Sequence, residues 1–459
     1  MAGIGFELKK IYGRKTLASN VWGTIYATMT TIGPTVLSAV LMLILNILLS
    51  RSGLTLLESR FFISSTTCAF LSALVNSAIF SAPVSRYIAD CIYLNRESEI
   101  FPSAFGVLAL STAISGTVMF LLCAGAYNSS YEVSMTFLVS YYLLGVLAAN
   151  AYNLMTYASA LKYHRELTFS FFLGLVLAVG VFLFERWLGV DRVTAACMAL
   201  TACFFLIVCA LIFQCVRAFG APRGRHFAFL AYFRQYPMLA VGGVLYILGL
   251  YSPTVIYWFF SDIWEQVCIF RSVPSYDMAM FLAFAVNIPA LVIFVVKVET
   301  AFYEKYTSYV SALNNGTLYL LQKERGVMTR VILRELFFVY EVQLIITVVL
   351  VCLISVFFPY LDASINMLHM FVMLSLGLCT VFCMYFTIVV FYYFSDYRSA
   401  CISAFVFLVI AVLTAAAAAL GGVYYLLPLP LLLGGLVGWL VSFVLLRRRM
   451  EKLDSFLMC

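Results

Sequence analysis

The sequence has few charged residues and almost no histidine, and these shortages exclude most classes of soluble protein. Charged side chains make up 11% of the 459 residues, whereas 64% are hydrophobic and the mean hydropathy is +1.02. Soluble domains are about one-quarter charged. A water-soluble fold of this length cannot hide so much apolar surface, so lipid must surround most of the chain.

Motifs that carry chemistry are also missing. The three histidines, His164, His226 and His369, are far apart, and none of the 13 cysteines forms a C-x-x-C pair, so we expect no metal site. Walker A, G-x-S-x-G and H-E-x-x-H motifs are absent, which gives no support to a built-in ATPase or hydrolase. The sequence therefore predicts neither a cofactor nor enzymatic activity.

Long apolar stretches account for nearly the whole chain. A helix needs about 20 apolar residues to cross a bilayer. The stretches lie at residues 22–50, 62–87, 102–126, 133–160, 167–189, 193–216, 236–260, 276–297, 337–359, 366–394, 400–422 and 426–446. The expected fold is an all-α, multi-pass membrane protein of about twelve spans.

The positions of lysine and arginine predict the orientation in the bilayer. With the N-terminus inside, every basic residue falls in a cytoplasmic segment except Arg51, Arg60, Arg186, Arg192 and Arg271. This asymmetry follows the positive-inside rule, and one misplaced span would scramble it. Both termini are therefore expected in the cytoplasm, and the net charge of +7 reflects this bias and not a nucleic-acid partner.

A weak internal repeat relates the two halves of the chain. IGPTVLS in the first span is similar to YSPTVIY in the seventh, with Pro34 and Pro253 separated by 219 residues, and the same offset pairs Gly23 with Gly242. Transporters built from two such halves place their substrate path between them. The repeat favours two six-helix bundles around a central cavity, although so few matched positions also arise by chance.

The predicted layout has six parts. Residues 1–20 and 298–336 mix charges with aromatic and aliphatic residues, which is typical of amphipathic helices at a membrane surface. In the connector 298–336, Lys305, Lys323 and Arg325 are candidates for docking a cytosolic partner, with a lipid anchor as the alternative. The remaining parts are 21–220 (first bundle), 221–297 (start of the second bundle), 337–446 (its remainder) and 447–459 (a basic cytoplasmic tail).

Polar residues inside the predicted spans are candidates for a transport path, because amides and carboxylates in hydrocarbon need a partner or water. Helix–helix adhesion uses the same residue types and is the alternative. Glu341 is either an interfacial residue or part of an inner gate with Arg86 or Arg334. The candidates are Thr31, Pro34, Asn76, Asn150, Tyr152, Asn153, Tyr246, Pro253, Asn287 and Glu341.

The opening M-A-G-I-G-F-E-L, followed by a basic stretch and by IGPTVLS in the first span, resembles the PelG family of Pel exopolysaccharide transporters. The resemblance implies a fold shared with polysaccharide flippases and multidrug-extruding antiporters, in the bacterial cytoplasmic (inner) membrane. The implied cargo is a polysaccharide rich in N-acetylgalactosamine and partly deacetylated. The implied partners are a cytosolic glycosyltransferase and a membrane protein that senses cyclic di-GMP. No catalytic or binding residue is carried over from the family.

The expected function is therefore export of an exopolysaccharide through the membrane within a synthase-dependent secretion complex. No predicted span has a basic residue at its centre, which disfavours a lipid-linked pyrophosphate cargo because phosphate is held by arginine or lysine. Two alternatives remain. One is an ion-coupled small-molecule antiporter that uses Glu341, and the other is a non-transporting scaffold for a glycosyltransferase.

Overall fold

The computed structural model describes residues 37–451, except 39, 50, 54, 161–163, 221–223, 296–297, 299, 316 and 358–364. Within these residues, eleven helices are long and apolar enough to cross a membrane, and Val40–Leu49 is a shorter apolar helix in the predicted first span. Each predicted span from the second to the twelfth overlaps one of the eleven helices. The prediction of an all-α, multi-pass protein with about twelve spans is confirmed.

The described chain forms two compact units, and one of its three passages between them lies in the interior of a helix. The first unit comprises residues 33–251 and 263–274, and the second comprises 252–262 and the chain from 275 onward. Helix α9 (Pro237–Phe260) contains Pro253 in its interior. A proline removes one backbone hydrogen bond from a helix. The division between the units therefore falls within two residues of a break in the hydrogen-bond ladder of α9.

The first unit is organised around one central helix, α5. Its helices are α3 (Leu56–Tyr93), η1 (Glu97–Glu99), α4 (Ile100–Tyr127), α5 (Met135–Ala160), α6 (His164–Trp187), α7 (Arg192–Phe219) and α8 (Leu230–Gln235), followed by the first part of α9. Helix α5 packs on α3, α4 and α7, and α6 packs on α7. The fully buried Ala148, Ala149 and Ala151 let the neighbouring helices approach α5 closely, as small residues do in membrane interiors.

A short β-hairpin completes the first unit at the end of α3 that is predicted to lie outside. Strands β1 (Glu265–Val267) and β2 (Phe270–Ser272) pair antiparallel. Arg60 forms a 2.8 Å ion pair with Glu265, and the rings of Phe61 and Phe270 lie 5.9 Å apart. The loop between α9 and the next span is thereby fixed to the start of α3.

The second unit repeats this organisation. It contains the end of α9 and α10 (Pro274–Phe294), α11 (Thr300–Asn315), α12 (Leu318–Phe357), α13 (Ile365–Tyr393), α14 (Tyr397–Leu420), η4 (Tyr424–Leu426) and α15 (Leu429–Glu451). Helix α13 is the most buried span and packs on α12, α14 and α15, while α14 packs on α15. The tenth span thus has the place that the fourth span, α5, has in the first unit. This correspondence supports the duplication suggested by Pro34 and Pro253.

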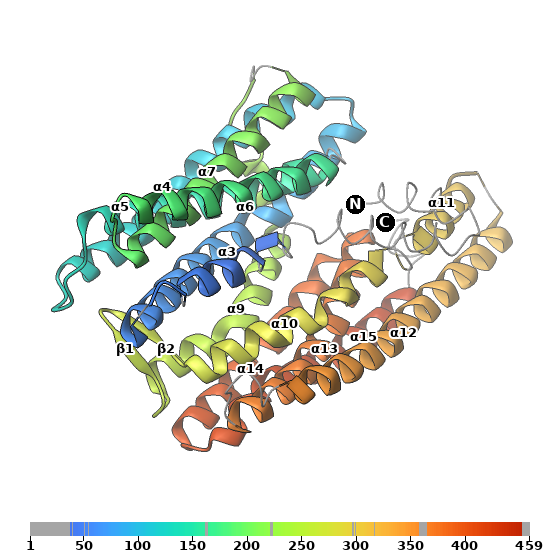
Figure 1. Ribbon diagram of the computed structural model, residues 1–459. Helices are drawn as coiled ribbons and strands as arrows, with labels where there is room; N and C mark the ends of the chain where they lie inside the picture. The colour runs from blue at the N-terminus through green and yellow to red at the C-terminus, as the bar shows by residue number, and fades with distance from the viewer. Residues whose placement is uncertain are drawn as a thin grey trace, which may run out of the picture. The chain divides into compact units, whose positions relative to one another are not determined.

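The connector predicted at 298–336 forms α11 and the beginning of α12. Helix α11 buries Phe302, Tyr309 and Ala312. It lies beside the first part of α12 (Figure 1). Helix α12 has 40 residues and is therefore about 60 Å long, roughly twice the hydrocarbon thickness. The second half of the connector is continuous with the ninth span.

Glycine determines how closely α13 and α15 approach. A Cβ atom on Gly435 would meet the Thr380 side chain and lie 2.9 Å from the Val381 backbone nitrogen, and one on Gly377 would lie 2.9 Å from the Leu432 nitrogen. Both distances are shorter than normal contacts. In membranes, where lipid is as apolar as the helix surface, such close backbone contact is a main source of helix association.

We predict that Gly435→Val destabilises the second unit, because the added side chain must push α13 and α15 apart. Overpacking of this kind costs about 1–3 kcal/mol. The matched control is Gly180→Val on α6, where a Cβ atom would meet nothing within 4 Å. The thermal unfolding midpoint of each purified variant in detergent measures the effect. Equal midpoints for the two variants would contradict this account of the α13–α15 contact.

Candidate functional site

Three spans of the first unit meet at a buried polar cluster. Asn76 on α3, Ser111 on α4 and Asn153 on α5 are each at most 3% exposed. The Asn76 side-chain amide donates a 3.0 Å hydrogen bond to the Ser111 carbonyl. The Asn153 amide donates to the Ser111 hydroxyl at 3.0 Å and to Asn76 Oδ1 at 3.3 Å. We call these three residues the first amide cluster.

Three spans of the second unit meet in the same way. Asn287 on α10 donates a 3.0 Å hydrogen bond to the Ser375 carbonyl on α13. From α12, Gln343 and Thr347 donate to Asn287 Oδ1 at 2.9 and 3.3 Å. All four residues are fully buried. We call them the second amide cluster.

The two clusters occupy corresponding positions in the two halves of the chain. The first joins spans two, three and four, and the second joins spans eight, nine and ten. In each cluster, an asparagine on the earlier span donates to the backbone carbonyl of a serine on a later span. An unsatisfied amide in hydrocarbon costs several kcal/mol. The clusters therefore fix the register of three helices in each unit.

Each cluster also retains one amide oxygen without a hydrogen-bond partner among the described residues. These atoms are Asn153 Oδ1 and Gln343 Oε1. Leaving a buried acceptor unpaired costs about 1–3 kcal/mol. The hydrogen bonds between helices use the amide donors of both clusters. They do not use these two acceptor oxygens.

Only some of the residues in the two amide clusters were predicted from sequence. Asn76, Asn153 and Asn287 were predicted, whereas Ser111, Gln343, Thr347 and Ser375 were not. Gln343 carries an amide inside a predicted span, and this signal was available. The serines and threonine resemble any hydroxyl residue of a membrane helix, and two of the key acceptors are backbone carbonyls that no side-chain pattern reveals.

The other predicted path residues lie apart from these clusters. Asn150 is 8% exposed and donates a 2.8 Å hydrogen bond to the exposed Thr112. Tyr152 is half-buried, with its ring 6.3 Å from that of Phe204. Tyr246 is half-buried in α9, and Pro253 is buried in the same helix. Thr31 and Pro34 lie outside the described residues.

Glu341 has an unusual position on α12. Its side chain is exposed, and no described residue forms a hydrogen bond or ion pair with its carboxylate. Arg334 pairs with Glu335 at 2.7 Å, and Arg86 pairs with Asp90 at 3.3 Å. Within the second unit, Arg334 is therefore paired with its neighbour Glu335 and not with Glu341.

Arg86 instead belongs to a polar group at the predicted inner end of α3. Asp90 accepts a 3.0 Å hydrogen bond from the Tyr232 hydroxyl, and the Arg86 guanidinium lies 5.8 Å from the centre of the Tyr236 ring. Burial, together with the hydrogen bond to Asp90, raises the pKa of Tyr232 to about 12. Tyr232 therefore remains a donor at physiological pH and holds α8 against α3.

The docking candidates of the connector lie on two helices. Lys305 is half-buried on α11, and Lys323 is exposed near the start of α12. Arg325 donates a hydrogen bond of 3.5 Å to the Glu451 carbonyl at the end of α15. Of the three, Lys323 is the most accessible to a partner.

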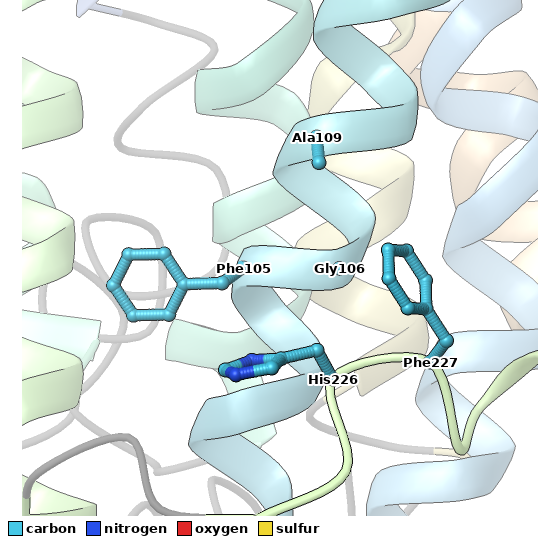
Figure 2. A pocket seen from close by; sticks show the side chains of 5 residues that line it. All are labelled: Phe105, Gly106, Ala109, His226 and Phe227. Atoms are coloured by element: carbon cyan, nitrogen blue, oxygen red, sulfur yellow. The ribbon is translucent and has the colours of Figure 1, made fainter.

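A shallow pocket lies beside the predicted inner end of α4 (Figure 2). Phe105 and Ala109 of α4 line it together with His226 and Phe227 from the segment before α8. The His226 ring nitrogen Nδ1 lies 3.1 Å from the Pro102 carbonyl, and a Cβ atom on Gly106 would collide with the His226 backbone. The lining offers one imidazole among apolar groups, so the pocket lacks the several donors and acceptors that a sugar requires.

Comparison with known proteins identifies the family. A family model described as "PelG: Putative exopolysaccharide Exporter (EPS-E)" matches residues 1–457. The chain belongs to the PelG family. This match confirms the resemblance that the first residues suggested. A comparison with curated protein sequences gives no match.

Solved structures of multidrug transporters share the fold of this PelG-family chain. A MATE protein in complex with MaL6 is 14% identical, with a TM-score of 0.64 over 94% of this chain and 97% of that one. An outward-facing multidrug resistance MATE family transporter of the MOP superfamily is 14% identical, with a TM-score of 0.64 over 94% and 96%. A MATE protein in the bent conformation is 12% identical, with a TM-score of 0.61 over 94% and 96%. Family and fold point to a transporter.

We predict that the two amide clusters behave as separate energetic units. Asn76→Ala and Asn153→Ala should be non-additive by about 0.6 kcal/mol or more, because the two amides share hydrogen bonds. Asn153→Ala and Asn287→Ala should be additive, since these residues share no partner. Unfolding free energies of the single and double variants in lipid nanodiscs measure both cycles. Additivity within the Asn76–Asn153 pair would show that the cluster is not cooperative.

Proposed function

We propose that this chain moves an N-acetylgalactosamine-rich, Pel-like exopolysaccharide across the bacterial cytoplasmic membrane, as the transport subunit of a synthase-dependent complex. The observation that carries the proposal is the PelG family match over residues 1–457, on a chain whose fold is that of a transporter. We place the chain in the inner membrane because a polymer made in the cytoplasm must cross that membrane first. We propose a purely transporting and not an enzymatic role.

The chemistry of the spans supports a neutral or weakly cationic polymer. The central helices α5 and α13 contain no lysine, arginine, aspartate or glutamate. Their buried polar groups are amides and hydroxyls, which pair with sugar hydroxyl and acetamido groups without attracting an ion. A phosphate-bearing cargo requires arginine or lysine to hold its charge.

Transport by the proposed complex is driven by polymer elongation. The chain has no Walker A motif to hydrolyse ATP. A cytosolic glycosyltransferase that adds sugars at the inner mouth pushes the polymer outward, and a membrane partner that senses cyclic di-GMP holds the complex together.

The cytoplasmic part of α12 is the proposed dock for the glycosyltransferase. About half of this helix exceeds the length needed to cross the bilayer. At its start, Tyr319 is 77% exposed and Leu320 is 40% exposed, next to the accessible Lys323. Large apolar side chains exposed in a polar setting are typical of protein contact sites.

An ion-coupled antiporter is the second candidate, and it is favoured by the MATE-like fold. Such a mechanism needs a carboxylate that exchanges ions with the substrate, and Glu341 was the sequence candidate. Glu341 is exposed on a peripheral helix and lies outside both amide clusters. Efflux of a small cation that depends on a proton or sodium gradient and is lost in Glu341→Gln would favour the antiporter over the polymer exporter.

The export proposal predicts that Tyr246→Ala lowers polymer secretion several-fold while the protein remains in the membrane. The half-buried ring of Tyr246 offers a flat apolar face and a hydroxyl, which together suit a sugar. Cells that make the glycosyltransferase are compared for secreted and retained polymer, with Tyr127→Ala, at an exposed end of α4, as the control. Unchanged secretion in Tyr246→Ala would remove α9 from the path. Normal secretion in cells lacking the chain would exclude the export function itself.

The docking proposal predicts that Tyr319→Ser combined with Leu320→Ser reduces the amount of glycosyltransferase that sediments with membranes. Both side chains would be desolvated on binding, so their loss weakens the complex by about tenfold or more. Leu188→Ser, at an exposed site just after the end of α6 that is predicted to face outside, is the matched control. Equal sedimentation in all three strains would place the dock elsewhere.

A further inference from the structure

The pocket beside α4 is a slot with one polar end and one apolar end. Its volume is about 490 Å³, within the range of about 300–1,000 Å³ that is usual for small-molecule sites. The rings of Phe105 and Phe227 lie on opposite sides of it, with Ala109 toward one end and the His226 imidazole toward the other (Figure 2). We call this pocket the α4 slot.

Two glycines hold the segment before α8 closely against α4. A Cβ atom on Gly106 would collide with the His226 backbone, and one on Gly224 would lie 3.3 Å from the Pro102 ring. Gly224 also has a φ of +150°, a conformation that favours glycine. At the end of the segment, Phe229 is fully buried. The α4 slot is therefore a fixed part of the first unit.

The polar end of the slot lies near the inner edge of the hydrocarbon. Helix α4 has 28 residues, and about 20 of them are enough to cross the hydrocarbon, so a segment centred on the helix begins near residue 104. Ala109 then lies about 8 Å inside the hydrocarbon. His226 contacts Gly106 and so lies close to the edge. In the predicted orientation, the slot runs from the inner headgroups toward the bilayer interior, as a lipid chain does.

A cationic side chain lies beside the polar end. Arg225 directly precedes His226, and its side chain is exposed. The contacts of its two neighbours with Pro102 and Gly106 place Arg225 at the level of the inner headgroups. No described residue forms a hydrogen bond or ion pair with its guanidinium. Basic pockets on the cytoplasmic side of membrane helices bind anionic lipid headgroups, and guanidinium groups hold phosphate well.

Other occupants fit the slot less well. A sugar needs several donors and acceptors, whereas the lining offers one imidazole. A partner helix needs a contact seam several turns long, whereas the slot covers about one turn of α4, from Phe105 to Ala109. The carboxylate nearest in sequence, Glu99, lies seven residues before Gly106, which is about 10 Å along the helix axis. It therefore leaves room for a phosphate at the polar end.

We propose that the α4 slot binds one anionic phospholipid of the inner leaflet. Its phosphate lies at Arg225 and His226, and one acyl chain lies between Phe105 and Phe227 and passes over Ala109. The bound lipid ties the connection between the sixth and seventh spans to α4 and so stabilises the first unit. This site goes beyond the proposed function, because it takes a component of the membrane and not the exported cargo.

The first test compares two lipids on the purified, delipidated chain in detergent, with native mass spectrometry to count bound molecules. The wild-type chain should bind one phosphatidylglycerol at least fivefold more tightly than phosphatidylcholine with the same acyl chains. Inorganic phosphate in excess should not displace the bound lipid, because the slot holds the acyl chain. Equal affinity for the two lipids, or displacement by phosphate, overturns the proposal.

The second test removes the cation. Arg225→Gln should weaken phosphatidylglycerol binding about fivefold, which is the typical effect of one basic residue near a membrane surface. The matched control is Arg448→Gln, at an exposed position near the inner end of α15. Binding that is unchanged in Arg225→Gln overturns the proposal. An equal loss in both variants shows an effect of net charge alone and overturns it as well.

The third test fills the slot. Ala109→Trp should reduce phosphatidylglycerol binding by about tenfold or more and abolish the rise in unfolding midpoint that the lipid gives the wild-type chain. Ala109 is exposed, so the larger side chain displaces lipid and not protein. Ala417→Trp, at an exposed position on α14, is the control and should keep both effects. Full binding by Ala109→Trp overturns the proposal, and if this variant does not fold, Arg225→Gln decides.

Discussion

The structure depends on the requirement that polar groups in hydrocarbon find their partners within the protein. Asn153 on α5 and Asn287 on α10 meet it by binding groups on two other spans in each unit. The central helices α5 and α13 pack mostly through apolar contacts, which have little directional preference. Directed hydrogen bonds supply that preference. Each unit is therefore held in one register by a few amides, and the second unit is also held by the glycine contact of α13 with α15.

A buried amide cluster recurs in both halves of the chain. Spans two to four and eight to ten each form a buried, hydrogen-bonded cluster around neutral amides. Two halves of similar construction are what the repeat in the first and seventh spans implies. Pro253 interrupts the hydrogen-bond ladder of α9 within two residues of a point where the chain passes from one unit to the other.

Most of the fold and part of the two amide clusters could be predicted from sequence, because a span in lipid must have a minimum length and an apolar composition. The second to twelfth spans were found, and Asn76, Asn153 and Asn287 were selected because amides in hydrocarbon are conspicuous. Two features escaped prediction. The Ser111 and Ser375 acceptors are backbone carbonyls, which carry no sequence signal. The continuity of α12 from Leu318 was hidden because its first half is as polar as a surface helix.

The shared fold leaves open how this chain differs from multidrug transporters, since a fold does not determine a function. The chain is 12–14% identical to these transporters, so any difference in function between them must come from their different side chains. In this chain, the central helices α5 and α13 contain no lysine, arginine, aspartate or glutamate, and Glu341 is exposed on the peripheral helix α12. A carboxylate there is poorly placed to exchange ions with a cargo held deep in the protein. In the proposed export complex, the energy for transport therefore enters from outside the chain, through a polymer that is extended at its inner end.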